Sequence, residues 1–282
     1  MNEDFQAVIQ HYEAAIPDAH ALVEQIGQQL DSGRPPGAEQ LALLDQFHVG
    51  GLPATKELAR RAKVQASDRV LDAGSGLGGP SRWLAATAGC EVDGVDLSPA
   101  FVAVADLLAR RAGLDGRVRY QTGSITRLPF AEAHFDLIWT QHVAMNIPDR
   151  TALYREFRRV LKPGGRLAFY DPCLANDASP VLHPTPWADS PESSHLLTRS
   201  ATEAALRQAG FELRLWDDVT SQAGAWQAAL AQSAAPSATA GAPGIGLGLV
   251  MGPRMATMVA NFQRNLREGR LALVMGVCVA QG

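Results

Sequence analysis

The feature that most constrains the fold is a glycine-rich loop that directly follows a short apolar run. The run and the loop read VLDAGSGLGG at residues 70–79. Glycine has no Cβ atom, so it adopts positive φ angles without strain and lets a ligand approach the backbone closely. The glycines of the loop are Gly74, Gly76, Gly78 and Gly79. This pattern predicts a binding site for a nucleotide-derived cofactor between a strand and a helix.

The sequence around this loop alternates between strand-like and helix-like segments. Strands are expected at 69–74, 90–98, 118–124, 135–143 and 166–173, and helices at 79–89, 99–114 and 149–161. The second of these helices begins with Pro99, whose missing N–H costs nothing at that position. The alternation predicts a parallel sheet with helices on both faces. Ligands bind such sheets at the carboxyl ends of the strands, where the strand order reverses.

The segments outside this region are expected to cover the site and to complete the sheet. Apolar residues recur at helical spacing within 4–47, which predicts short helices ahead of the glycine loop. A helix at 202–210 is followed by strands at 211–219 and 270–280. The long connection between these two strands contains an Ala/Gly/Pro-rich run at 231–248. Connections of this length are usually lids over a site or disordered segments.

Charge and cysteine content exclude several classes of protein. The formal charge of −4 and the isoelectric point near 6.0 give no electrostatic attraction for nucleic acid or for an anionic membrane surface. Cys90, Cys173 and Cys278 form no CxxC pair, so neither a disulfide scaffold nor a zinc site is expected, and no acidic cluster marks another metal site. The N-terminus does not resemble a signal peptide, and no apolar run reaches the roughly 18 residues of a membrane span. We therefore expect a soluble, cytoplasmic protein without a metal.

The glycine loop alone fits two cofactors. Within 74–79 the spacing GxGxxG matches the dinucleotide fingerprint, and GxGxG matches the looser loop of enzymes that bind S-adenosylmethionine (SAM). Asp96 follows Gly76 by twenty residues, where either cofactor needs a carboxylate for its ribose hydroxyls. Asp72, beside the loop, favours SAM, because a carboxylate repels a pyrophosphate and attracts the sulfonium and ammonium groups of SAM.

The motifs along residues 45–172 resemble those of the class I SAM-dependent methyltransferases. They read DQFHVGG, VLDAGSGLGG, GVDLS, GSITRLPF, FDLIWTQHV and RVLKPGG. Within that family the chain is similar to the small-molecule group that contains the UbiE-type quinone, tocopherol, sterol and phosphoethanolamine methyltransferases. The resemblance implies a Rossmann-like α/β fold with a doubly wound, mostly parallel seven-stranded sheet and a helical cap. It also implies SN2 transfer of a methyl group from SAM to oxygen, nitrogen or activated carbon of a small, partly apolar acceptor.

The resemblance suggests how the chain is divided. Residues 1–50 are expected to form an N-terminal helical cap, and residues 51–175 the SAM-binding α/β core. Residues 176–282 are expected to complete the core sheet and to carry an inserted acceptor lid at about 220–268. Such a lid would exclude water, since methyl transfer depends on the alignment of nucleophile, methyl group and sulfur.

The resemblance also implies roles in cofactor binding. The loop glycines would underlie the methionine half of SAM, Asp96 would take the ribose hydroxyls, and Leu97 would pack against the adenine. Ser124 and Ile125 would face the adenine edge, although most relatives have an acidic residue at position 124. Gln141 would reach the methionine part. The expected cofactor-binding residues are Asp72, Gly74, Gly76, Gly78, Asp96, Leu97, Ser124, Ile125 and Gln141.

Three residues are candidates for the catalytic step. His142 stands where the sterol, tocopherol and phosphoethanolamine enzymes tend to have Glu or Asp, and Asn146 where relatives often have His. An imidazole removes protons near neutral pH, so His142 is a candidate base, the alternative being a polar residue that orders the loop. His48 precedes a Gly-Gly pair that could cover the sulfonium. Tyr170 ends the fifth predicted strand, close to where an acceptor would lie.

An apolar acceptor pocket is a further expectation. Aromatic and methionine side chains late in the chain could line it, although their helical spacing also fits ordinary packing. These residues are Trp187, Trp226, Met251, Met255, Met258 and Phe262. By contrast, the histidines interpreted as surface or loop residues are His11, His20, His134 and His183.

Two other functions stay open from the sequence. The chain could be an NAD(P)-binding oxidoreductase, or a SAM-binding protein without catalysis, which only an activity assay excludes. Neither a nucleic-acid partner nor a membrane span is expected, and the N-terminal helices could pack within one subunit or form a homodimer. The alanine-rich composition and the lid suggest a bacterial enzyme of secondary metabolism.

Overall fold

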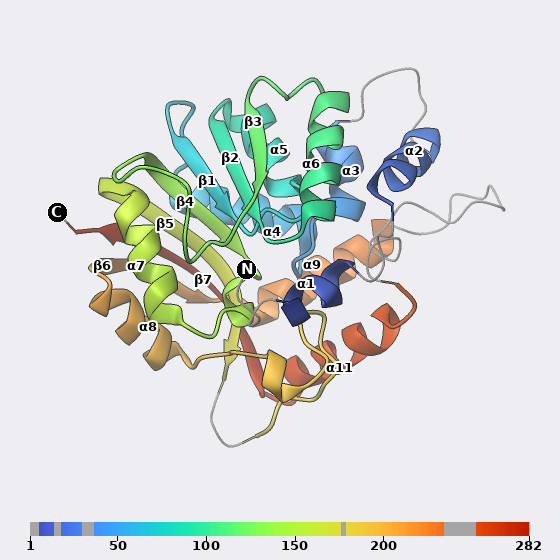
Figure 1. Cartoon of the computed structure of the whole chain (residues 1–282). Helices are drawn as coiled ribbons and strands as arrows, with labels where there is room; N and C mark the ends of the chain where they lie inside the picture. Colours follow the sequence, from blue (N-terminus) through green and yellow to red (C-terminus); the bar gives the residue numbers. More distant parts are fainter. Residues whose placement is uncertain (1–5, 14–17, 30–36, 176–178, 234–251, 282) are drawn as a thin grey trace.

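Seven strands form a single sheet in the order β3-β2-β1-β4-β5-β7-β6 (Figure 1). The computed structural model describes residues 6–13, 18–29, 37–175, 179–233 and 252–281. The strands are β1 (Arg69–Ala73), β2 (Glu91–Asp96), β3 (Val118–Thr122), β4 (Phe135–Gln141), β5 (Leu161–Leu174), β6 (Phe211–Asp218) and β7 (Leu271–Ala280). The central strands are buried almost throughout, as expected for a sheet with helices on both faces.

The sheet is mixed in direction. β1 to β5 run parallel to one another, whereas β7 is antiparallel to both of its neighbours, β5 and β6. Parallel neighbours need a crossover connection, and α5 (Gly79–Ala88) and α6 (Pro99–Arg111) provide the two that join β1, β2 and β3. The predicted α/β fold of the Rossmann-like kind is therefore confirmed, with β7 as its reversed strand.

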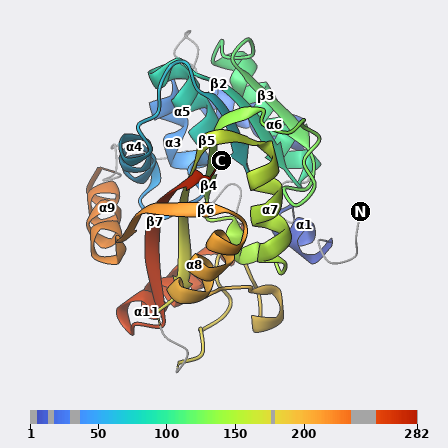
Figure 2. The same cartoon turned by 90° about the vertical axis from the view of Figure 1, so that its left-hand side faces the viewer.

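Helices cover both faces of the sheet, as Figure 2 shows. One face is covered by α4 (Gly51–Ala62), α5 and α9 (Thr220–Ser233), and the other by α7 (Arg150–Val160) and α8 (Arg199–Gln208). On α7, Leu153, Phe157 and Val160 recur at helical spacing and are buried against the sheet. The regularly spaced apolar residues of this predicted helix thus form its contact with the core.

The N-terminal segment folds as three short helices, two of which pack with α6. The three are α1 (Gln6–Glu13), α2 (Ala19–Gln29) and α3 (Ala38–Asp45). Ile26 of α2 and Leu44 of α3 are buried in one cluster with Phe101 and Val104 of α6. The prediction of helices within 4–47 is confirmed for the described part of that segment.

The fifth strand begins earlier in the sequence than expected. β5 begins at Leu161 instead of at 166, because Leu161 pairs with Phe135 before a register shift accommodates the KPGG residues. The helical spacing of the late methionine and phenylalanine residues is explained by α11 (Met255–Arg267). Most of the Ala/Gly/Pro-rich run lies outside the described residues. Within the described ranges, no helix has the length and apolar character needed to cross a membrane.

Candidate active site

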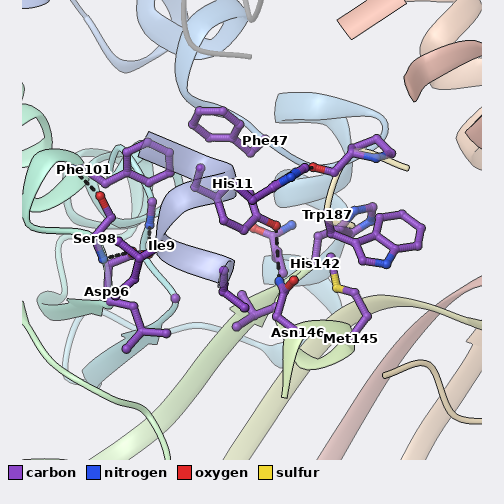
Figure 3. Close-up of a pocket in the computed structure, with 18 of the residues that line it drawn as sticks. Ile9, His11, Phe47, Asp96, Ser98, Phe101, His142, Met145, Asn146 and Trp187 are labelled. Atoms are coloured by element: carbon purple, nitrogen blue, oxygen red, sulfur yellow. Dashed lines mark hydrogen bonds between the residues drawn. The ribbon is translucent and has the colours of Figure 1, made fainter. Parts of the chain in front are cut away.

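A cavity of about 500 Å³ lies at the carboxyl ends of β1, β2 and β4 (Figure 3). Gly74 follows β1, Asp96 ends β2 and Gln141 ends β4, and all three line the cavity. β1 stands between β2 and β4, so this is the point at which the winding of the sheet reverses. The cavity therefore occupies the position predicted for a ligand in a sheet of this topology.

The cavity has two halves, which lie at opposite sides of Figure 3. The Asp96 half comprises the lining residues of the glycine loop and those of 96–101 and 125. The His142 half comprises the lining residues of 142–147, 186–187 and 252–258. Ile9 and His11 of α1 lie between the two halves.

The glycine loop is shaped for close approach. Gly74 has a φ of +81°, and a Cβ added there would lie 2.4 Å from the side chain of Val143. Gly76 has a φ of +53°, and its N–H donates a hydrogen bond of 2.8 Å to Oδ2 of Asp96. Both glycines line the cavity. The glycine loop and Asp96 are thus joined by a hydrogen bond, although Gly76 and Asp96 lie twenty residues apart in the sequence.

Asp96 is held on both carboxylate oxygens. Its Oδ1 accepts from the backbone N–H of Ser98 at 3.0 Å, and its Oδ2 from Gly76. Burial raises the pKa of Asp96, against the opposing effect of these hydrogen bonds. Each oxygen retains a second lone pair for a ligand, and Leu97 and Ile125 add apolar surface beside it.

Three residues expected to bind the cofactor lie off the cavity lining. Ser124 bonds Thr126 through their hydroxyl groups at 2.8 Å, and Ile125 lines the cavity in its place. Gly78 is the N-cap of α5, and its carbonyl accepts from the hydroxyl of Tyr120 at 3.1 Å. Asp72 is the third. Direct contact of Ser124, Gly78 and Asp72 with a ligand stays a prediction. Their positions away from the lining do not favour it.

The start of α5 is covered by the end of α3. A Cβ added at Gly79 would lie 2.5 Å from both the backbone oxygen and Oδ1 of Asp45. A dinucleotide-binding fold places its pyrophosphate at this helix terminus, where free N–H groups receive it. Here the end of α3 occupies the approach, so the site is closed to that group by its shape.

Asp72 is buried between β1 and α5. Its Oδ2 accepts from Oγ of Ser81 at 2.5 Å, and only 2% of the residue is exposed. Burial raises the pKa of Asp72 to about 7; the Ser81 hydrogen bond acts in the opposite direction, and Asp96 adds to the rise. The carboxyl therefore lies behind the loop and contributes a full negative charge only above neutral pH.

This burial predicts how stability depends on pH. Because the folded pKa of Asp72, about 7, exceeds its unfolded value, its contribution to stability is present at low pH and is lost as pH rises through 7. Relative to Asp72→Asn, the wild type should lose about 2 kcal/mol of unfolding free energy between about pH 5 and pH 6.5. Urea unfolding of both proteins at the two pH values measures this difference. Parallel pH profiles would contradict the assignment.

The turn after β4 carries the central residues of the other half. His142 has a φ of +54°, and its N–H donates to the backbone oxygen of Tyr170 at 2.7 Å. Oδ1 of Asp171 accepts from the N–H of Val143 at 2.9 Å and from that of Ala144 at 3.4 Å. β5 thus fixes this turn, and with it the place of the His142 ring in the lining.

His48 and Tyr170 lie behind His142 instead of on the cavity. The ring centroids of His142 and Tyr170 are 4.9 Å apart, and that of His48 is 6.1 Å from His142 and 5.9 Å from Tyr170. Burial lowers the pKa of His48 to about 4. Burial, helped by His48, also holds the pKa of His142 well below its ordinary value. The imidazole at the cavity is therefore neutral at pH 7, and one of its ring nitrogens carries a free lone pair.

The side chain of Gln141 is oriented by two hydrogen bonds to its oxygen. Its Oε1 accepts from the indole N–H of Trp139 at 2.8 Å and from Oγ1 of Thr55 at 3.3 Å. With the oxygen engaged, the amide nitrogen has no hydrogen-bond partner among the described residues. A lining residue with a fixed donor suits an anionic group of a ligand.

Helix α1 contributes to the cavity in a way that its sequence does not predict. His11, expected at the surface, lines the cavity and donates from Nε2 to the oxygen of Pro186 at 3.1 Å. The hydroxyl of Tyr12 accepts from Nδ2 of Asn146 at 3.2 Å. Val8 and Ile9 also line the cavity, so the apolar face of α1 identified from its periodicity faces the site. Nothing local in the sequence predicts contacts between residues this far apart.

The expected apolar pocket is present in part. Trp187 and Met258 line the cavity, and Phe262 packs edge-on against Trp187 with centroids 5.5 Å apart. Trp226 instead packs on Gly50. Among the other expected pocket residues, Met255 is off the lining and Met251 lies outside the described residues.

Comparisons with known proteins agree with this geometry. Residues 71–169 match the family described as "Methyltransferase domain". Methyltransferase GfsG of Streptomyces halstedii is 39% identical over 128 residues, which are 45% of this chain and 46% of that protein. A probable chloroplastic tocopherol O-methyltransferase of Oryza sativa subsp. japonica is 34% identical over 130 residues, covering 46% of this chain and 34% of that protein. The matches thus span less than half the length of these relatives.

Solved structures extend the similarity of fold over nearly the whole chain. Geranyl diphosphate C-methyltransferase from Streptomyces coelicolor A3(2) gives a TM-score of 0.66 at 18% identity and covers 99% of this chain and 98% of its own. The [4+2]-cyclase SpnF gives 0.62 at 23% identity, covering 81% and 80%. At such identities the likeness concerns the fold alone. Residues 71–169 thus match a methyltransferase domain, and phosphoethanolamine, tocopherol and sterol methyltransferases are among the relatives to which this chain is similar.

Proposed function

We propose that this protein is a SAM-dependent methyltransferase that acts on a small-molecule acceptor. The observation that carries the proposal is a cavity lined by the loop glycines and Asp96, beside a helix α5 whose start is covered by Asp45. A dinucleotide would need that helix terminus for its pyrophosphate, so the NAD(P) alternative has no support. The curated relatives, which include tocopherol, sterol and phosphoethanolamine methyltransferases, support the same function.

The residues of the Asp96 half fit the parts of SAM by their chemistry. Asp96 would accept from the ribose hydroxyls, and Leu97 and Ile125 would pack on the adenine. The loop glycines would let the methionine part approach the backbone, and the amide nitrogen of Gln141 would donate to its carboxylate. When bound, SAM supplies a methyl group that its positive sulfur makes electrophilic.

The His142 half would receive the acceptor. His142 is proposed as the base that takes a proton from the acceptor, because its ring lines the cavity and is neutral at pH 7. Tyr170 and His48, which pack behind this ring, are proposed to position it without touching the acceptor. Of the three catalytic candidates, His142 is thus proposed as the catalytic residue, and His48 and Tyr170 as positioning residues.

The elements around the cavity are proposed to serve as a cap and a lid. α1 is proposed to serve as the cap of the N-terminal unit, since it lines the cavity between both halves. Pro253, Arg254 and Met258 line the cavity from within the proposed lid at about 220–268. A bacterial, cytoplasmic role in secondary metabolism, and a homodimer, remain part of this proposal and rest on the sequence.

The cofactor assignment is tested by calorimetric titration of the wild type with S-adenosylhomocysteine (SAH) and, separately, with NADH. We expect SAH to bind with a dissociation constant of about micromolar order and NADH to show no heat of binding. Binding of NADH without SAH would return the chain to the oxidoreductase class. Transfer of labelled methyl groups to a small-molecule extract then separates an enzyme from a protein that only binds SAM.

A further inference from the structure

The charge of the cavity lining restricts the chemistry of the acceptor, on the basis of the function proposed above. Only two of the described lining residues carry a carboxylate, ammonium or guanidinium group: Asp96 and Arg254. Asp96 belongs to the half assigned to the cofactor. The His142 half therefore contains, within the described residues, one ionised side chain, that of Arg254.

Arg254 is already neutralised. Its Nη1 lies 2.8 Å from Oδ1 of Asp189 and its Nη2 lies 3.2 Å from Oδ2, which is a two-point ion pair. Nδ1 of His11 lies 3.6 Å from the same carboxylate. Asp189 itself does not line the cavity, and its negative charge balances the positive charge of Arg254. The rim near Arg254 therefore presents no net charge to a ligand.

The rest of the lining of this half is apolar or neutral. Met145, Pro186, Trp187 and Met258 provide its apolar surface.

A charged acceptor would be unstable in such a place. Burying an ammonium group without a carboxylate, or a phosphate without a free arginine or lysine, costs several kcal/mol that apolar contacts do not return. Two polar side chains nevertheless stand in this half. Nε2 of His142 and Oδ1 of Asn146 are buried, and neither has a hydrogen-bond partner among the described residues. They offer hydrogen bonds to one small neutral polar group.

We propose that the acceptor is an uncharged, largely apolar molecule that presents a hydroxyl group to His142 and Asn146. Methylation of a hydroxyl forms an O–CH₃ bond as the S–CH₃ bond breaks, which leaves a neutral thioether and releases the hydroxyl proton. The neutral imidazole of His142 takes that proton and becomes an imidazolium. An alkene acceptor would leave both polar side chains without a partner, and an aliphatic amine would enter as a cation.

The test uses SAH-loaded protein and three ligands that share one apolar body. These are 2-naphthol, which is uncharged at neutral pH, the cation 2-naphthylmethylammonium and the anion 2-naphthoate. Calorimetry should show 2-naphthol binding at least about tenfold more tightly than either ion, since neither ion finds a counter-charge. Equal or tighter binding of an ion, or no binding of 2-naphthol, would overturn the proposal. Failure of SAH itself to bind would instead count against the proposed function.

Two variants change the charge of this half in opposite directions and control for each other. Asn146→Asp adds a carboxylate of the same shape and should strengthen binding of the cation about tenfold, without helping the anion. Asp189→Asn frees the guanidinium of Arg254 and should strengthen binding of the anion to a similar degree. The side chain of Asp189 is half exposed, so this variant is expected to fold even if Asn146→Asp does not. Unchanged ligand preference in a folded, SAH-binding variant would overturn the proposal.

Discussion

Replacing Asp96 by alanine is expected to weaken SAH binding by at least about 100-fold, because a hydrogen bond to a charged group contributes about 1.5–3 kcal/mol and the ribose offers two hydroxyls. The same substitution releases the N–H of Gly76 and of Ser98, which the carboxylate now holds. The loop would thus lose its ligand contact and its fixed shape together. Calorimetric titration with SAH measures the loss.

Two matched variants separate these effects. Asp96→Asn keeps one carbonyl oxygen for the N–H of Gly76, so we expect affinity between those of the wild type and the alanine variant. Asp93→Ala removes a carboxylate from the same strand, where it pairs with Arg69 and lies off the cavity lining. Its SAH affinity should stay within about twofold, as for a site without ligand contact. Equal losses in Asp93→Ala and Asp96→Ala would show that the effect is one of folding.

Replacing Arg82 by methionine is expected to lower the free energy of unfolding by about 3–5 kcal/mol, the usual cost of breaking a buried ion pair from one side. Nη2 of Arg82 lies 2.6 Å from Oδ2 of Asp45, and both side chains are almost wholly buried. Nη1 also donates to the backbone oxygens of Leu77 at 2.7 Å and Ala105 at 3.3 Å. One guanidinium thus joins α3, the glycine loop and α6.

The loss of stability in Arg82→Met comes from the buried polar groups that the substitution leaves without a partner. Burial already raises the pKa of Asp45 to about 6, although Arg82 opposes the rise. Without Arg82 the carboxyl would be an unpaired buried acid beside two carbonyl groups that have lost a donor. Urea unfolding measures the loss, with Arg60→Met as the control, since Arg60 is exposed and its surface ion pair with Glu57 contributes little to stability.

The double variant Asp45→Leu, Arg82→Met provides the internal check. Removing both charges should recover much of the stability, because no group is left buried and unpaired. If Arg82→Met alone cost less than about 1 kcal/mol, the pair would not be the element that holds the loop. SAH affinity should fall in Arg82→Met more than in the control, since the loop carbonyl at Leu77 loses its anchor.

Side-chain direction explains most of the differences between the expected and the observed site. Successive residues of a strand point to opposite faces, and on β1 Val70 belongs to one core cluster and Leu71 to the other. Asp72 follows Val70 by two residues and so faces α5, where it meets Ser81 instead of the cavity. The motif located this acid beside the loop but not on the ligand side of it.

The α/β fold, the glycine loop and the position of Asp96 at the end of the next strand could be predicted from residue patterns. These features are local, because the loop and Asp96 end two neighbouring parallel strands joined by a single helix. The packing of separate elements, by contrast, places α1 on the cavity, Asp45 over the start of α5 and His48 behind His142. These contacts join side chains from separate elements, and no periodicity or spacing records which elements pack together. Cofactor chemistry could thus be inferred from short motifs, whereas the charge of the acceptor half depends on how distant segments meet.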